Sequence, residues 1–318
     1  MVRIAIFMAL LNLCGWTEEF TDVGYQELSC YDTSRDREIS FLVIYPCDFT
    51  LHSKKINDCY LAKGAKLDSN AIYPLVMYSH DHQGHYWESL WLGYALAQRG
   101  YIFTSVDHPG NTSYHRDILD NYFSYWNRPL DISFVLSHVL SGSLSQHINQ
   151  FDISMTGFSL GGLTTLWLAG AFADFTLFKA ILQKRIPKDL PPAIYSLFSQ
   201  LRPKYLEKFY HDCRFRRYIA LAPDFGQAFT QLGLFLIERP VLCITSQSDT
   251  ITPPELNAQH YAADNPQIQS IVIPSSANHD AFITTPNEYT HQAMQTSTAT
   301  MILQFLQDDR LLHNKHTS

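Results

Sequence analysis

The sequence is poor in basic residues, has no C-x-x-C pair of cysteines, and contains no internal repeat or low-complexity tract. Its 23 lysines and arginines are outnumbered by 30 aspartates and glutamates, which gives a formal net charge of -7. Nucleic-acid binding depends on a basic surface that displaces counterions, so DNA and RNA are excluded as expected partners. Six scattered cysteines without C-x-x-C indicate neither a structural zinc site nor a disulfide framework, although Cys47 and Cys59 can pair in an oxidising compartment.

Long apolar runs are also missing, apart from the first residues of the chain. One basic residue, Arg3, precedes a dozen mostly apolar residues at positions 4–15, and polar residues follow. This run is too short to span a bilayer as a helix, but it has the shape of a secretory signal peptide. We therefore expect residues 1–16 to be a signal peptide and the protein to be secreted or periplasmic. The alternative is a buried N-terminal strand or helix in a cytoplasmic protein.

The remainder has enough apolar residues for a large core, because 46% of the chain is hydrophobic. Residues 24–32 and 37–47 are predicted to form a β-hairpin, and residues 48–72 an irregular surface segment. Buried strands are predicted at 74–79, 101–106, 152–158, 217–223, 240–246 and 269–274, and helices at 86–99, 118–141 and 292–312. Strands that alternate with helices indicate a parallel sheet. We expect a break at Pro129 and, where four prolines separate short amphipathic pieces, a helical cap inserted at residues 172–213.

The pattern G-x-S-x-G lies between a predicted strand and a predicted helix, and its serine is Ser159. Such a turn holds its middle residue in a strained conformation and leaves the side chain exposed at the turn, as in a nucleophile elbow. Gly157 and Gly161 flank the serine because strand and helix cross too closely there for a Cβ atom. Free backbone N–H groups at the start of the helix suit a negative charge that develops on a substrate oxygen.

A serine nucleophile needs a base and an acid, and both are expected at the carboxyl ends of later strands. His279 follows the last predicted strand and is the expected base. Asp249 follows the preceding strand and is the expected acid, which gives the chain order Ser, Asp, His. Asp224 ends another strand and remains the alternative acid.

Five segments together resemble the dienelactone hydrolase-like serine esterases, a group that includes platelet-activating-factor acetylhydrolases and cutinase-type polyester hydrolases. They are Ser79-His80-Asp81-His82-Gln83-Gly84, Asp107-His108-Pro109-Gly110-Asn111, Gly157-Phe158-Ser159-Leu160-Gly161-Gly162, Asp249-Thr250-Ile251-Thr252-Pro253 and Asn278-His279. The resemblance implies an α/β-hydrolase fold over residues 22–314, with a mostly parallel central sheet flanked by helices. It implies ester hydrolysis through an acyl-enzyme without a cofactor, and an oxyanion hole formed by the backbone N–H groups of His82 and Leu160.

The sequence departs from this family in three respects. Dienelactone hydrolases proper have a cysteine nucleophile, and Ser159 in its place favours ordinary ester hydrolysis. Asp81 stands where the family has a glycine in the oxyanion loop, which bears on the backbone geometry of that loop. Acetylhydrolases place their acid one strand earlier, which would select Asp224, whereas cutinase-type members match Asp249.

Other polar groups in the sequence admit alternative interpretations. His80, Asp81, His82 and His85 can be interpreted as metal ligands, but further ligands are not evident and we expect no metal site. Arg128 and Asp131 are expected to form a structural polar pair. Asn111-Thr112-Ser113 fits a glycosylation sequon.

The sequence thus predicts a serine hydrolase that cleaves carboxylic esters and acts on a small-molecule or lipid ester. The alternative within enzymes is a phospholipid acetylhydrolase active in lipid degradation, whose aromatic cap would contact a membrane surface. The alternative from another class is a non-catalytic binding protein with the same fold. Acyl chain length, alcohol preference and oligomeric state do not follow from the sequence.

Overall fold

The computed structural model describes residues 22–48, 53–67, 71–188, 190–200, 208–263, 265–283 and 289–308. Four predicted features fall at least in part outside these residues. They are the signal peptide at 1–16, the surface segment at 49–52 and 68–70, the cap at 189 and 201–207, and the end of the last helix.

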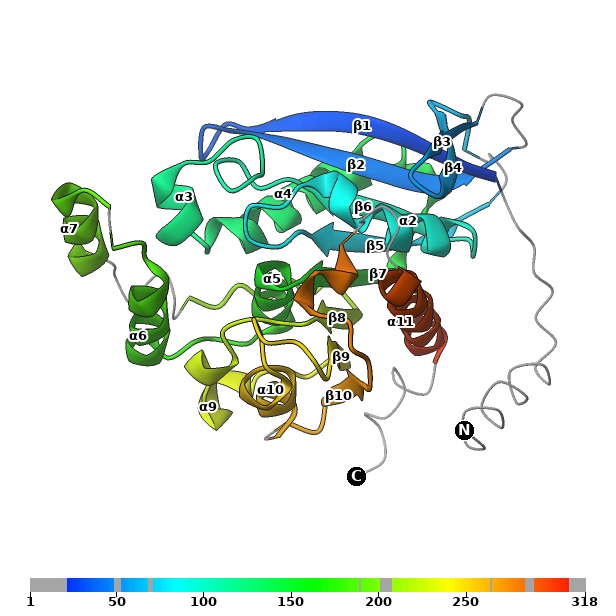
Figure 1. Cartoon of the computed structure of the whole chain (residues 1–318). Coiled ribbons are helices and arrows are strands. Elements are labelled where there is room, and N and C mark those ends of the chain that lie inside the picture. The colour runs from blue at the N-terminus through cyan, green and yellow to red at the C-terminus, as the bar shows by residue number, and fades with distance from the viewer. Residues whose placement is uncertain are drawn as a thin grey trace, which may run out of the picture.

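A ten-stranded sheet runs through the described part of the chain, in the order β10-β9-β8-β7-β5-β6-β2-β1-β4-β3 (Figure 1). Its strands are β1 (Asp22–Asp32), β2 (Arg37–Cys47), β3 (Lys54–Ile56), β4 (Cys59–Lys63), β5 (Tyr73–Ser79), β6 (Ile102–Val106), β7 (Ile148–Phe158), β8 (Arg217–Leu221), β9 (Val241–Ser246) and β10 (Ile268–Ile273). Strands β5 to β10 pair in parallel, whereas β1 and β2 form the antiparallel hairpin that the sequence predicts. The predicted α/β class with a mostly parallel sheet is confirmed.

Helices cover both faces of this sheet. The longer ones are α2 (Leu90–Ala97), α4 (Asn127–Ser141), α5 (Leu160–Ala169), α6 (Phe175–Arg185), α7 (Pro192–Gln200) and α11 (Tyr289–Gln307), and the shorter ones are α3 (Ile118–Tyr122), α9 (Gln231–Leu234) and α10 (Ala258–Ala263). Alternate residues of each strand point to opposite faces, so β5 contributes Leu75 and Met77 to one core and Val76 and Tyr78 to the other. The first core includes side chains of α4 and α5, and the second those of α2 and α11.

The parallel strands end at the same edge of the sheet, and helices α6 and α7 lie beyond that edge (Figure 1). Phe178 of α6 is buried and stacks on Phe225, with ring centroids 4.4 Å apart. Phe225 follows β8, so α6 packs against the loops at the carboxyl ends of the strands. These helices occupy the predicted cap segment.

Two predictions about local structure are wrong. The segment 48–72 contains the short hairpin of β3 and β4, which turns at Asn57 with φ of 52° and adds to the sheet beside β1. The break in the helical segment 118–141 precedes Asn127, whereas Pro129 lies in the first turn of α4. Proline fits a first turn because the N–H groups there have no partner within the helix.

Two further findings concern a possible disulfide bond and membrane-spanning helices. Cys47 and Cys59 are buried free thiols, so they do not form the disulfide considered above. None of the described helices is both long and apolar enough to cross a membrane.

Candidate active site

Ser159 occupies a sharp turn between β7 and α5. Its φ of 54° and ψ of -112° lie outside the favoured regions for a residue with a side chain. A Cβ atom at Gly157 would lie 2.2 Å from the carbonyl oxygen of Gly161, and one at Gly161 would lie 1.9 Å from that of Ser79. The close crossing predicted from the glycines is therefore confirmed, and it explains why residues on both sides of Ser159 lack side chains.

His279 and Asp249 lie in a row with Ser159. Nε2 of His279 is 2.9 Å from Oγ of Ser159, and Nδ1 is 2.7 Å from Oδ2 of Asp249. His279 begins the short 3-10 helix η5 (His279–Phe282) after β10, and Asp249 follows β9, so three loops at one sheet edge supply the row. The structure brings together the three residues that the sequence selects, and their catalytic roles stay a prediction.

The carboxylate of Asp249 is held by four hydrogen-bond donors. Oδ1 accepts the N–H groups of Ile251 and Thr252, and Oδ2 accepts the Thr252 hydroxyl at 2.9 Å as well as the imidazole N–H of His279. Burial raises the pKa of Asp249, but the hydrogen bond and charge of His279, with the Thr252 donors, lower it overall. Asp249 is therefore ionised at neutral pH and fixes the hydrogen of His279 on Nδ1. Sequence reasoning did not single out Thr252, three residues after the acid.

The alternative acid, Asp224, has different partners. Its carboxylate forms a two-pronged ion pair with Arg185 of α6, in which Nη2 lies 2.7 Å from Oδ1. Its backbone N–H donates to the carbonyl oxygen of Ser159 at 3.2 Å, and its own carbonyl accepts the Tyr261 hydroxyl. Asp224 thus ties the cap to the turn at Ser159, while the imidazole is bonded to Asp249.

The two predicted oxyanion donors come from different parts of the chain. Leu160 is the first residue of α5, where backbone N–H groups have no carbonyl four residues earlier. His82 lies in the loop after β5, and the amide that follows it, that of Gln83, donates to the Asn111 side chain. The positive φ in this loop, 62°, falls on Gln83 and not on Asp81, so the replacement of the family's glycine requires no unusual dihedral there. Both donor roles stay predictions.

A buried polar network behind this loop was largely missed from the sequence. His108 donates from Nδ1 to Asp131 at 3.1 Å and accepts the Ser79 hydroxyl at Nε2, 2.8 Å away. Asp131 is paired with Arg35 at 2.7 Å, so the expected Arg128 and Asp131 pair is wrong. Arg128 instead donates to the carbonyl oxygens of His80 and Asp81 in the loop after β5. Buried arginines signal such a network, but the sequence does not show which arginines are buried.

The residues of the possible metal site and of the glycosylation sequon belong to this buried network or contact it. His80, Asp81 and Glu88 place ligand atoms within 4.8 Å of one another. Both ring nitrogens of His80 are engaged, however, one with the His108 amide and one with the Asp81 carbonyl, and Glu88 accepts backbone amides. The side chain of Asn111 is buried and bonded to Arg128 and Asn121, so the sequon is not accessible to glycosylation in the folded protein.

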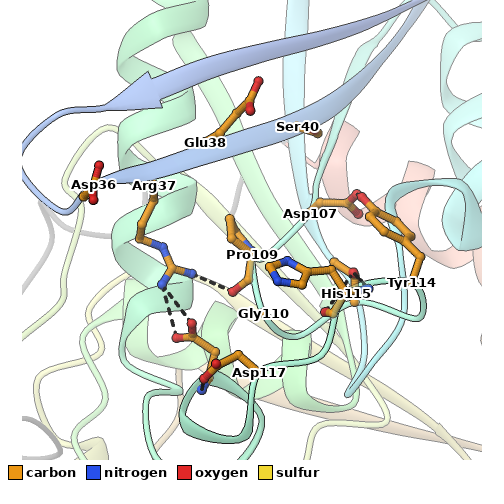
Figure 2. Close-up of a pocket in the computed structure, with 12 residues that line it drawn as sticks. Asp36, Arg37, Glu38, Ser40, Asp107, Pro109, Gly110, Tyr114, His115 and Asp117 are labelled. Carbon is orange, nitrogen blue, oxygen red and sulfur yellow. Dashed lines mark hydrogen bonds and ion pairs between the residues drawn. The ribbon is translucent and has the colours of Figure 1, made fainter.

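Among the described residues, at least two pockets lie at this edge of the sheet. One, of about 460 Å³, is formed by the start of β2 and the loop after β6, and in it Arg37 contacts Asp120 and the carbonyl of Pro109 (Figure 2). None of the predicted site residues lines it. The other, of about 420 Å³, is lined by residues 81–85 and therefore opens beside His82.

No protein-family model and no curated protein matches this sequence. Solved structures do match, among them a ferulic acid esterase from Streptomyces cinnamoneus with a TM-score of 0.62 and 16% sequence identity. The match covers 92% of this chain and 90% of that one. At this identity the match shows the fold alone, so the α/β-hydrolase fold is confirmed, and the dienelactone hydrolase-like subtype stays a prediction.

Proposed function

We propose that this chain is a serine hydrolase that cleaves carboxylic esters through an acyl-enzyme. The observation that carries the proposal is the hydrogen-bonded row of Ser159, His279 and Asp249 at a strained turn between strand and helix. A serine hydroxyl is a weak nucleophile unless a neighbouring base accepts its proton. The esterase that shares this fold supports the choice of a carboxylic ester as the substrate class.

Each group has a defined step in the proposed reaction. Oγ of Ser159 attacks the ester carbonyl carbon while Nε2 of His279 takes its proton, and Asp249 stabilises the imidazolium that results. The N–H groups of Leu160 and His82 stabilise the negative oxygen of the tetrahedral intermediate. The intermediate then expels the alcohol, which receives the proton from His279. Water repeats the sequence on the acyl-enzyme and releases the acid.

A short-chain p-nitrophenyl ester and a fluorophosphonate probe test the proposal together. The wild type should hydrolyse the ester and bind the probe covalently, whereas Ser159→Ala should lose both, with a fall in rate of more than about 10⁴-fold. Ser137→Ala is the matched control, because Ser137 lies exposed on α4. Hydrolysis or labelling that persists in Ser159→Ala would refute the proposal. A wild type that binds substrates but neither turns them over nor takes the label would be a binding protein.

A further inference from the structure

Arg128 is a buried cation that holds two consecutive peptide groups of the loop after β5. Its Nη1 donates to the carbonyl oxygen of His80 at 2.6 Å, and its Nη2 donates to that of Asp81 at 2.5 Å. Burial lowers the pKa of Arg128 to about 10, so the guanidinium keeps its charge at neutral pH. Both hydrogen bonds are therefore charge-assisted, which makes them about twice as strong as neutral ones.

Glu88 binds backbone N–H groups of the same loop, whereas Arg128 binds its carbonyl oxygens. Its Oε1 accepts the N–H of Asp81 at 2.8 Å, and its Oε2 accepts that of His85 at 3.3 Å. The Glu88 side chain is buried, and His85 in turn caps the short helix η1 (Tyr86–Ser89) by accepting the N–H of Trp87. Glu88 thus fixes the peptide group between His80 and Asp81, whose carbonyl Arg128 already holds.

The next peptide group, between Asp81 and His82, carries the predicted oxyanion donor. In a trans peptide the N–H points away from the C=O, so an Asp81 carbonyl directed at Arg128 directs the His82 N–H away from Arg128. The amides on either side are committed, that of Asp81 to Glu88 and that of Gln83 to Asn111. A hydrogen bond to a carbonyl also polarises the N–H of the same peptide group and strengthens it as a donor.

Arg128 is itself fixed by the buried network. Nη1 lies 3.2 Å from the Ser79 hydroxyl, which donates to His108, and Nη2 lies 2.8 Å from Oδ1 of Asn111. The Ser79, Arg128 and Asn111 side chains are all buried. The guanidinium therefore has one position, and the peptide groups that it holds have one orientation.

We propose that Arg128 and Glu88 are positioning residues of the oxyanion hole, which orient and polarise the His82 N–H for the ester hydrolysis proposed above. Neither side chain needs to touch substrate. Because the donor acts on the transition state, its loss should lower kcat and leave KM nearly unchanged. Removal of one oxyanion donor costs about 10²- to 10³-fold in kcat, which sets the upper limit for misplacing it.

Arg128→Lys is the first test, because one ammonium group cannot bond two carbonyls in the geometry of the fork. We expect kcat on a p-nitrophenyl ester to fall by about 10- to 100-fold with little change in KM. The affinity for a trifluoromethyl ketone, which forms a tetrahedral oxyanion on the serine, should fall in parallel. Arg217→Lys is the matched control: Arg217 is also buried and ion-paired, with Asp152, but lies at the opposite end of the strands.

Two variants of Glu88, Glu88→Gln and Glu88→Ala, provide the second test if Arg128→Lys does not fold. Glutamine keeps one side-chain oxygen, which can accept the Asp81 N–H, and loses only the longer hydrogen bond from the His85 N–H. Glu88→Gln should therefore keep kcat within about threefold, whereas Glu88→Ala should lose about tenfold or more.

The outcomes separate this inference from the proposed function. Ester hydrolysis that is abolished by Ser159→Ala, with Arg128→Lys and Glu88→Ala equal to the Arg217→Lys control, would overturn the positioning role alone. Losses that appear in KM instead of kcat would overturn it as well. A folded wild type without serine-dependent hydrolysis would overturn both proposals.

Discussion

Asp249→Asn keeps the shape of the side chain but replaces one carboxylate oxygen by an NH2 group. Oδ1 of Asp249 accepts the backbone N–H groups of Ile251 and Thr252, at 2.9 and 2.8 Å, so the amide oxygen must take this position. The NH2 group then faces Nδ1 of His279, which must give up its hydrogen in order to accept. The hydrogen moves to Nε2, and the imidazole can no longer take the proton of Ser159.

The expected loss follows from this change of tautomer. Asparagine in place of the acid of a Ser-His-Asp triad lowers kcat by about 10⁴-fold, which corresponds to about 5.5 kcal/mol in the activation free energy. KM should change little, because Asp249 is buried behind the imidazole and is not exposed to substrate. Initial rates over a range of p-nitrophenyl ester concentrations measure both constants.

Asp224→Asn is the matched comparison, since it removes a carboxylate at the same sheet edge. Its ion pair with Arg185 is partly open to solvent, because 40% of the arginine side chain is exposed. Such pairs contribute at most about 1 kcal/mol to stability. Even if all of this free energy were lost from the transition state, the rate would fall by less than about tenfold. Equal losses in the two folded variants, or a larger loss in Asp224→Asn, would refute the reasoning from the His279 tautomer.

Two further predictions concern stability. Burial raises the pKa of Asp81 from 3.8 to about 6, so the folded protein keeps a proton that the unfolded chain releases between about pH 4 and pH 6, and stability falls as pH rises through this window. Asp81→Asn should remove that loss and raise the free energy of unfolding at pH 7 but not at pH 4; urea unfolding that shows the same change at both values would contradict this. Gly161→Ala places a Cβ atom 1.9 Å from the Ser79 carbonyl oxygen and should lower stability by about 2 kcal/mol or more, with loss of activity, whereas an unchanged melting temperature would show that the elbow yields easily.

The sequence predicts those parts of the fold that repeat a regular pattern. Buried strands such as β5 and β6 consist mostly of apolar and β-branched residues, and the glycines around Ser159 mark a close crossing that the structure confirms. The hairpin of β3 and β4 escaped prediction because its strands are only three and five residues long, and β3 begins with two exposed lysines. The helix break was wrongly placed at Pro129 because a proline is compatible with either a break or the first turn of a helix. Only the position of the preceding loop distinguishes the two.

The candidate site could also be predicted only in part from the sequence. Strand ends predict that Ser159, His279 and two aspartates share one sheet edge, but the choice between Asp249 and Asp224 depends on distances that no spacing in the sequence specifies. The role of Arg128 depends on its burial, which arises only when α4 packs behind the loop after β5. Long-range contacts between charged groups leave no periodic trace in a sequence, so such a residue resembles any surface arginine until the fold is known.

The buried Ser79, His108 and Asp131 side chains lie in a row, 2.8 and 3.1 Å apart, close to the 2.9 and 2.7 Å that join Ser159, His279 and Asp249. A template search for serine hydrolases that compares interatomic distances alone would therefore return this buried set as well as the row of Ser159, His279 and Asp249. Two simple filters separate them, since Ser79 is fully buried at the end of a regular strand, whereas Ser159 has a positive φ and a hydroxyl at the rim of the sheet. Surveys of hydrolase folds gain specificity when backbone conformation and solvent access are scored together with the side-chain geometry.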